Sequence, residues 1–385
     1  MSKPNQKPKN INFGSGPSAK RPGWTPSVLN NALVARSHRS ADSMARIRDL
    51  LDRTRRILKI PADYKIALTP GSDTGAMEMA MWSLCGSRPV DAVVFDHFGD
   101  LWRHDVMTEL KIKNSRVLTA PVGQLPNLHE IDFAHDVIFC WNGTTTGVCV
   151  PNSDWISPDR GGLTICDATS AAFAYDLPWD LLDVTTYSFQ KVLGGEGAHG
   201  VIICSPRAME RLAQSNPPWP MPRLFRLLKN GKVNEDVWNG STINTPSMLC
   251  IEDCLDALKW IETNGGLDAM TRRSQNNFAA IDQWVEKTPW ADFLAEEPSA
   301  RSRTSVCLKI IEPGYRELPD EQARAICRSI ADTLMAEKVA TDIMGHKEAP
   351  PNIRLWAGGM VETGDIQKLL PWLDWAYSLY KSKAN

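Results

Sequence analysis

The chain has 385 residues, with 43 Lys and Arg against 45 Asp and Glu, and 43% of its residues are hydrophobic. This length predicts two or three domains that each bury a core. A charged fraction of 23% is typical of a globular protein and not of a disordered or fibrous one. The net charge of -2 gives no electrostatic reason to expect nucleic acid or an anionic membrane as the main partner.

The sequence also indicates a cytoplasmic location. No run approaches the roughly 18 consecutive apolar residues of a membrane span. The polar, Lys- and Pro-rich start of the chain lacks the apolar core of a secretion signal. Nine cysteines are scattered through apolar runs, and the four-residue spacing of Cys250 and Cys254 suits a helix face better than a zinc site. We therefore expect buried free thiols in a reducing compartment, and no metal.

The first predicted elements are helical. Thr25-Pro26 has the form of a helix start. A clearer helix is predicted over residues 43–58, where apolar residues recur on one face. The rest of this helix carries five arginines interleaved with aspartates. We expect that arginine face to be exposed to solvent and not to bind nucleic acid.

From residue 64 onward, short Val- and Ile-rich runs alternate with helical or turn segments. Strands are predicted over residues 65–68, 92–95, 116–118, 136–140, 163–166, 184–187 and 200–203. Non-alternating runs of this kind are typical of a mostly parallel sheet that is covered on both faces. The first domain is therefore predicted to be α/β.

A loop at residues 216–222 is too rich in Pro to be regular. Helices are predicted after it over 247–262 and 266–285, and the second of these is a candidate connector between domains. Beyond the connector lies a second, α+β pattern, with a strand over 305–310, a helix over 321–337, a strand over 352–356 and a final helix over 363–380.

Polar residues that follow the predicted strands are the first candidates for a site, because ligands of open α/β sheets bind at the carboxyl ends of the strands. A Gly-rich turn at residues 69–76 leads into an apolar helix, and a phosphate suits such a helix N-terminus. An ordinary strand-to-helix turn that binds no ligand explains this sequence about as well. Residues 141–147 supply threonine hydroxyls at the same edge, and a simple Thr-rich turn is the alternative there.

Two charged residues follow successive strands of this sheet. Asp167 is a carboxylate at the tip of a buried strand, where a charge is costly unless it is paired. Lys191 lies 24 residues further on, among Gly and apolar residues, where burial would lower its pKa and favour a nucleophilic amine. Alone, such a lysine is more often a surface loop residue. Residues 195–200 match a GxGxxG string, but a strand follows where the dinucleotide fingerprint needs a helix.

Together these strand ends resemble those of the fold-type I pyridoxal-phosphate enzymes, and more narrowly a divergent member of the phosphoserine aminotransferase family. The motifs that carry the resemblance are NFGSGP at 12–17, SHRS at 37–40, CDATS at 166–170, SFQK at 188–191, NTP at 244–246, GH at 345–346 and Arg354. The SHRS motif and the GH motif with Arg354 are specific to this family, whereas many relatives share the pair of Asp and Lys.

The resemblance implies a fold-type I architecture, in which helices cover a mostly parallel sheet in a large domain and a smaller α+β domain follows. We predict an N-terminal arm over residues 1–24 that packs on the small domain. The large domain is predicted over residues 25–265 and the small domain over residues 266–385.

The resemblance also implies pyridoxal 5'-phosphate as the cofactor. Lys191 would form a Schiff base with it and move the proton during the reaction. Asp167 would keep the ring nitrogen protonated, so that the ring can act as an electron sink. Trp102 would stack on the ring, Thr144 would contact the ring hydroxyl, and Gln190 would contact the phosphate.

Four further residues are implied at the cofactor phosphate. Asp73 and Thr74 would cradle it from the Gly-rich turn. Asn244 and Thr245 would reach it from the partner subunit of a homodimer with shared active sites.

For the substrate, the resemblance implies that Arg354 binds the α-carboxylate and that Ser15 contacts the amino acid. His38, Arg39 and His346 would hold a distal phosphate or carboxylate. An Arg fork suits a planar carboxylate, and a mixed His and Arg cluster accepts either anion. The implied reaction is a ping-pong transfer between glutamate and 3-phosphohydroxypyruvate that gives O-phospho-L-serine and 2-oxoglutarate for serine biosynthesis. Action on 4-phosphohydroxy-L-threonine in vitamin B6 (pyridoxine) biosynthesis is also implied.

One departure from the family pattern concerns the distal group. The Gly-rich turn at residues 71–75 has no arginine, whereas the usual phosphoserine enzymes have one there. Lys20, Arg21 and Lys347 are the expected replacements. The alternatives are an alanine- or serine-glyoxylate aminotransferase of the same fold, a less favoured cysteine desulfurase, and a non-enzymatic ligand-binding protein.

Overall fold

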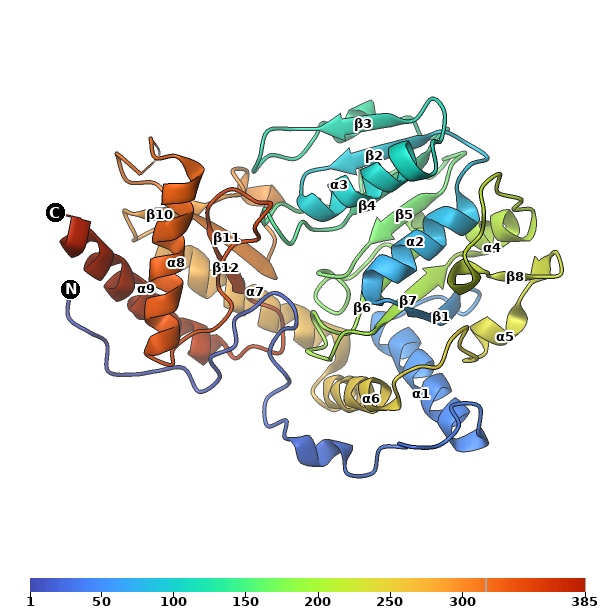
Figure 1. The fold of residues 1–385 in the computed structure, drawn as a ribbon, viewed down its shortest axis with the longest axis horizontal. Coiled ribbons are helices and arrows are strands. Elements are labelled where there is room, and N and C mark those ends of the chain that lie inside the picture. Colours follow the sequence, from blue (N-terminus) through green and yellow to red (C-terminus); the bar gives the residue numbers. More distant parts are fainter. Residues whose placement is uncertain (316, 385) are drawn as a thin grey trace.

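The computed structural model describes residues 1–315 and 317–384. They form a larger unit around a seven-stranded sheet and a smaller unit around a three-stranded sheet, seen side by side in Figure 1. The predicted domain limits stay a prediction. No helix among the described residues is long and apolar enough to cross a membrane. All nine cysteines are free thiols, and eight of them are buried.

The seven-stranded sheet has the order β1-β7-β6-β5-β4-β2-β3. Only β7 runs antiparallel to its neighbours, so the predicted mostly parallel sheet is confirmed. Each predicted strand agrees with an observed one to within two residues. The strands are β1 (Lys65–Pro70), β2 (Val90–Val94), β3 (Arg116–Thr119), β4 (Asp136–Cys140), β5 (Thr164–Asp167), β6 (Val184–Ser188) and β7 (His199–Cys204).

Strand register places the candidate charged residues at one edge of this sheet. Asp167 is the last residue of β5 and pairs with Cys140 of β4 on one side and Thr186 of β6 on the other. Lys191 follows the end of β6 after two intervening residues. The three strands β4, β5 and β6 are buried along their whole length, which explains why apolar and polar residues do not alternate along them.

Helices cover the sheet and position its loops (Figure 1). Helix α2 packs on β6 and β7, α3 packs on β2 and β4, and α1 packs against α6. The helices of this unit are α1 (Ala41–Leu58), α2 (Ser72–Leu84), α3 (His97–His104), α4 (Pro206–Ala213), α5 (Glu235–Trp238) and α6 (Met248–Thr263). Its short elements are the 3-10 turns Pro26–Leu29, Leu128–Glu130, Trp179–Leu181 and Arg223–Phe225, a π turn Asp105–Glu109, and the hairpin β8 (Leu228–Lys229) with β9 (Lys232–Val233).

The arginine face of α1 differs from the prediction. Several of its arginines bind carboxylates of α6 and do not simply face solvent. Arg46 lies 3.2 Å from Glu252, and Arg56 lies 2.9 Å from Glu262, which also pairs with Arg53. Arg56 is still exposed, as expected, whereas Arg46 and Arg53 are partly covered. The sequence does not show that α6 presents acidic side chains to α1.

The smaller unit contains an antiparallel sheet in the order β10-β11-β12. Its elements are β10 (Ala291–Phe293), β11 (Ser305–Ile310), β12 (Ile353–Trp356), the 3-10 turn Pro298–Ala300, α7 (Gly266–Val285), α8 (Asp320–Ala336) and α9 (Thr363–Ala384). Helix α9 packs on α7 and α8.

The start of the chain runs along this smaller unit (Figure 1). The backbone N–H of Thr341 donates to the carbonyl of Ile11 over 2.8 Å, and that of Trp356 donates to Phe13 over 2.9 Å. The Trp372 indole donates to the Gln6 carbonyl over 2.7 Å. These bonds hold the arm so that it leads from the small unit to the edge of the large sheet.

Candidate active site

A cavity of about 170 Å³ lies at the carboxyl ends of β4, β5 and β6, beside the N-terminus of α2. The structure brings together seven of the residues that the sequence predicts to bind a cofactor. The lining residues are Gly16, Ser72, Asp73, Thr74, Asp96, Phe98, Trp102, Cys140, Asn142, Thr144, Asp167, Thr169, Ser170, Gln190 and Lys191. Because they come from segments far apart in the chain, the fold alone assembles this site.

Lys191 is buried at the wall of the cavity, and its side chain is next to the N-terminal arm. Its Nζ lies 5.8 Å from the centroid of the Trp356 ring. A Cβ built on Gly16 would lie 3.0 Å from Nζ, and Gly16 has φ +152, so a side chain at this position would crowd the amine. The neighbouring Ser15 is also buried. The arm is tied here by the Ser18 backbone N–H, which donates to the Gln190 carbonyl over 2.9 Å.

The electrostatic setting of Lys191 favours a neutral amine. Burial is the largest cause that lowers its pKa, from 10.5 to about 7, and the positive charge of Arg354 adds to this effect. The carboxylates of Asp167, Asp96 and Asp73 act in the opposite direction. A neutral amine has the lone pair that a nucleophile needs, so the structure supplies the property that the sequence suggested for Lys191.

We expect the Lys191 amine to react with an aldehyde at a rate that rises with pH and levels off above an apparent pKa of about 7. The rate should rise in this direction because only the neutral amine attacks. The pKa should be higher in Arg354→Gln, because a positive charge that disfavours the ammonium is removed. The measurement is the pH dependence of pyridoxal-phosphate uptake by cofactor-stripped protein. An unchanged profile in Arg354→Gln would contradict the assigned cause.

Asp167 is held by donors at the tip of β5. Its Oδ2 accepts a hydrogen bond from the Trp102 indole over 3.2 Å, and its Oδ1 accepts one from the Thr169 backbone N–H over 2.9 Å. These bonds stabilise a carboxylate that is only 7% exposed. Asp167 and Lys191 therefore lie in one cavity and not in separate ones.

Arg354 links the smaller unit to this cavity. It lies on β12, and its Nη1 donates to the carbonyl of Thr144 over 3.4 Å. The Thr144 hydroxyl is within 2.7 Å of Ser170 Oγ. Because Arg354 contacts Thr144 and Thr144 lines the same cavity as Lys191, a carboxylate bound by Arg354 would lie at that cavity.

Curated relatives decide the family of this chain. No family model matches it. The chain is 48% identical over 379 residues to phosphoserine aminotransferase of Methanosarcina mazei, and the match covers 98% of this chain and 100% of that protein. The same protein of Methanosarcina barkeri matches equally, with 48% identity. The chain belongs to the phosphoserine aminotransferase family.

Solved structures agree on the fold of this family member. The pyridoxal-phosphate-bound phosphoserine aminotransferase of Trichomonas vaginalis has a TM-score of 0.78 at 18% identity, and the match covers 95% of this chain and 100% of that one. An alanine–glyoxylate aminotransferase of Nostoc sp. has a TM-score of 0.76 at 20% identity, covering 98% and 97% of the two chains. The predicted fold-type I architecture and the predicted transaminase family are therefore confirmed.

The residues around the cavity fit the cofactor of this family. Several buried polar atoms here have no hydrogen-bond partner among the described residues, which is costly unless a ligand supplies one. They are Ser15 Oγ, Gln190 Oε1 and Arg354 Nε. Helix α2 begins at Ser72, directly after Gly71 with φ 78, so its N-terminal N–H groups lie at the cavity and suit a phosphate.

Asp73 is an acidic residue beside the expected phosphate site at the start of α2. Burial, followed by the negative charge of Asp167, raises the pKa of Asp73 well above its usual range. This shift favours the uncharged form of the carboxyl group, which would repel a phosphate at the start of α2 less than a carboxylate would.

Seven predicted site residues do not line this cavity, and they are Ser15, His38, Arg39, Asn244, Thr245, His346 and Arg354. Arg39 is exposed, and its backbone N–H donates to Ser37 Oγ over 3.2 Å. Asn244 donates to the carbonyl of its exposed neighbour Thr245 over 3.2 Å. Neither these residues nor His38, which is next to Arg39, lines the cavity. A single chain therefore does not bring them to Lys191.

The expected replacements for the missing turn arginine were mostly wrong. Lys20 lies 2.6 Å from Asp253, and Arg21 forms two bonds of 2.7 and 2.9 Å to Asp256. Both cations are therefore held on α6. Lys347 is exposed and faces Glu348 at 3.8 Å.

Sequence reasoning missed Asp96, His97 and Phe98, which follow β2 at the same sheet edge. Asp96 begins α3 as its N-cap and accepts the Gly99 N–H over 2.9 Å. Burial is the main cause that raises its pKa to about 6. The rule that singled out residues after other strands would have found these three as well, since they follow β2 directly.

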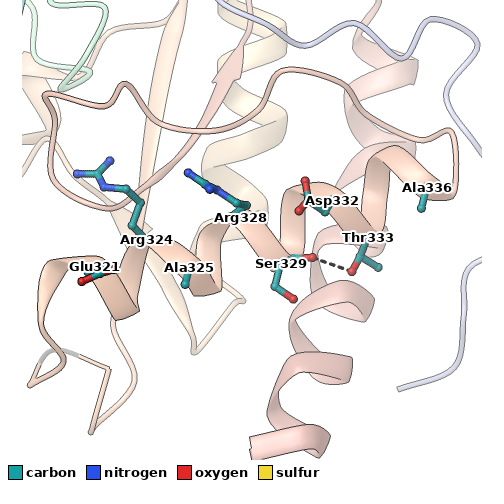
Figure 2. A pocket seen from close by; sticks show the side chains of 8 residues that line it. All are labelled: Glu321, Arg324, Ala325, Arg328, Ser329, Asp332, Thr333 and Ala336. Carbon is teal, nitrogen blue, oxygen red and sulfur yellow. Dashed lines mark hydrogen bonds between the residues drawn. The ribbon is translucent and has the colours of Figure 1, made fainter.

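A groove of about 680 Å³ along α8 is larger but carries no comparable chemistry (Figure 2). All its lining residues lie on one helix, and their charges are of both signs. Arg324 in this groove donates to the carbonyls of His346 and Ala349 over 3.3 and 2.7 Å. The groove has no lysine and no residue of the site around Lys191. The cavity beside α2 is therefore the candidate active site.

Proposed function

We propose that the protein transfers an amino group between glutamate and 3-phosphohydroxypyruvate, giving O-phospho-L-serine and 2-oxoglutarate. The observation that carries this proposal is that Lys191 and Asp167 line one cavity, with Arg354 beside it, in a chain whose relatives are phosphoserine aminotransferases. A neutral amine, a fixed carboxylate and a guanidinium are the groups that a transaminase of amino acids requires.

Pyridoxal 5'-phosphate, when bound, supplies an electron sink through its protonated ring nitrogen. Asp167 would hold that nitrogen, Trp102 would pack on the ring, and Thr144 and Gln190 would contact its polar groups. Asp73, Thr74 and the first N–H groups of α2 would hold the phosphate.

The other residues act on the substrate. Arg354 would bind the α-carboxylate that glutamate and phosphoserine share, since its Nε has no partner among the described residues. Lys191 Nζ would then take the proton from the Cα of the amino donor. It would return a proton to the Cα of the product amino acid when the amino group is transferred to the keto acid. Ser15, buried beside Gly16, would contact the bound amino acid.

We also propose a homodimer with shared sites, in the cytoplasm. His38, Arg39, Asn244 and Thr245 would reach the partner's cavity, because they lie outside the cavity of their own chain. Nine free thiols fit a reducing compartment. A site that holds an α-carboxylate and a distal phosphate would also suit 4-phosphohydroxy-L-threonine.

Steady-state assays with two keto acids and two donors test this function. We expect turnover with 3-phosphohydroxypyruvate and glutamate, and far less with glyoxylate and alanine. Preference for glyoxylate would instead support the alanine- or serine-glyoxylate alternative. A protein that stays colourless at saturating pyridoxal phosphate would contradict the enzyme proposal and favour a non-enzymatic protein.

Arg39→Ala should weaken phosphoserine binding by more than about 1.5 kcal/mol, the scale of a charge-assisted hydrogen bond. The reason is the loss of a guanidinium that pairs with the distal phosphate. The measurement is the phosphoserine KM, supported by an equilibrium titration.

Mixed dimers can show which subunit Arg39 serves. When Arg39→Ala and Lys191→Ala subunits are mixed, the hybrid has one site with an intact Lys191 and an intact Arg39 from the other subunit. We expect this hybrid to recover the parental KM. The control is a hybrid of a wild-type subunit with an Arg39→Ala/Lys191→Ala subunit. In this hybrid each site lacks either Lys191 or Arg39. Lack of recovery would place Arg39 outside the partner's site.

A further inference from the structure

Two imidazoles stack beside the active site. The rings of His97 and His346 are 4.8 Å apart at the centroids, with 29° between their planes. Phe98, which lines the cavity, lies 5.6 Å from His97 and 6.0 Å from His346. The backbone N–H of His97 donates to Thr145 Oγ1 over 3.0 Å, which fixes the start of α3 against the loop that follows β4. The histidine pair therefore lies next to the cavity wall.

The hydrogen bond to His346 determines which of its nitrogens can donate. The Nδ1 atom accepts the Glu348 backbone N–H over 3.3 Å. A neutral imidazole that accepts at Nδ1 carries its proton on Nε2. His346 can therefore donate from Nε2 in its neutral form, which matters because burial, and then the charges of His97 and Arg354, lower its pKa.

Arg354 relates this pair to the reacting amine. The segment that carries His346 pairs with its strand, because the Arg354 backbone N–H donates to the Ile343 carbonyl over 2.8 Å and the Gly345 N–H donates to the Asn352 carbonyl over 3.0 Å. Its guanidinium reaches the carbonyl of Thr144, which lines the same cavity as Lys191. A substrate whose α-carboxylate lies on Arg354, with its amino group toward Lys191, can extend its other end toward His346. The distal anion of the substrate would then meet the two imidazoles.

We propose that His97 is a specificity-determining residue, which together with His346 binds the distal phosphate of the substrate in place of the arginine that the Gly-rich turn lacks. This assignment rests on the proposed function. It names the ligand class as a phosphomonoester dianion carried on an amino acid. Two imidazole donors favour a phosphate, which has more charge and more acceptor oxygens, over the distal carboxylate of glutamate.

His97→Phe and His97→Asn test the assignment together. Phenylalanine keeps an aromatic ring against His346 but removes the donor, whereas asparagine keeps a donor and removes the ring. In His97→Phe, we expect kcat/KM for phosphoserine to fall about tenfold or more, the effect of one lost charge-assisted hydrogen bond. The value for glutamate should fall much less, so the ratio of the two reports selectivity. His97→Asn should recover part of that ratio.

His104→Asn is the matched control, because His104 lies on the same helix, is half-exposed and faces Glu109 at 3.3 Å. It should keep the parental ratio. A parental ratio in His97→Phe would show that His97 only packs against His346, and would overturn the proposal. Equal losses for both substrates would overturn it too. If the parent enzyme itself fails to turn over phosphoserine, the proposed function fails first, and that result is visible without any variant.

Discussion

Lys191→Ala should abolish transamination, with kcat reduced by about 10⁴-fold or more. The variant loses the buried amine that holds the cofactor and moves the proton at the substrate Cα, and no other lysine lines the cavity among the described residues. We also expect the visible absorption band of the cofactor-loaded protein, which borohydride should remove in the parent, to be lost in the variant. Absorption spectra and initial rates measured on the same samples test both points.

Lys59→Ala is a suitable control for this variant. Lys59 is exposed, and it pairs with Asp268 over 2.9 Å at the surface. The control should keep both the band and the rate. A Lys191→Ala protein that retained a borohydride-sensitive band would show that another amine holds the cofactor, and the assigned role of Lys191 would be wrong.

The residues that the sequence predicts well are those next to buried parallel strands. Asp167 ends the strand β5 and Lys191 follows the strand β6, and both strands are short, non-alternating and fully buried. Parallel strands end at a common edge, so two polar residues after two such strands must lie close together. The position of each strand therefore predicted the centre of the site without any knowledge of side-chain contacts.

Other features depend on contacts that no local pattern reveals. The raised pKa of Asp73 follows from its burial and then from the negative charge of Asp167, which only the fold places near it. The binding of Lys20 to Asp253 depends on where α6 lies, so the sequence left this lysine free to be considered for the substrate. Strand β10 has only three residues, too few for a periodic pattern. His38 and Arg39 remain predictions, because a second copy of the chain would have to complete their site.

The remaining large effect concerns the charge at the tip of β5. Asp167→Asn should lower kcat by about 10²–10³-fold, the usual loss when one preorganised charged group is removed from the reacting centre. Asparagine keeps the size of the side chain and can still accept from the Trp102 indole, so the fold should persist. What it loses is the negative charge that would hold the ring nitrogen of the cofactor in its protonated form. The measurements are kcat and the position of the cofactor absorption band.

Asp167→Glu and Asp176→Asn separate this charge effect from a general loss of folded, active protein. Glutamate restores the charge at a shifted position and should recover part of the lost rate, whereas Asp176 is an exposed aspartate whose substitution should change nothing. An Asp167→Asn enzyme with nearly parental kcat would mean that a neutral group suffices at the ring nitrogen. The pairing of a fixed anion with a neutral amine, on which the proposed chemistry depends, would then have to be abandoned.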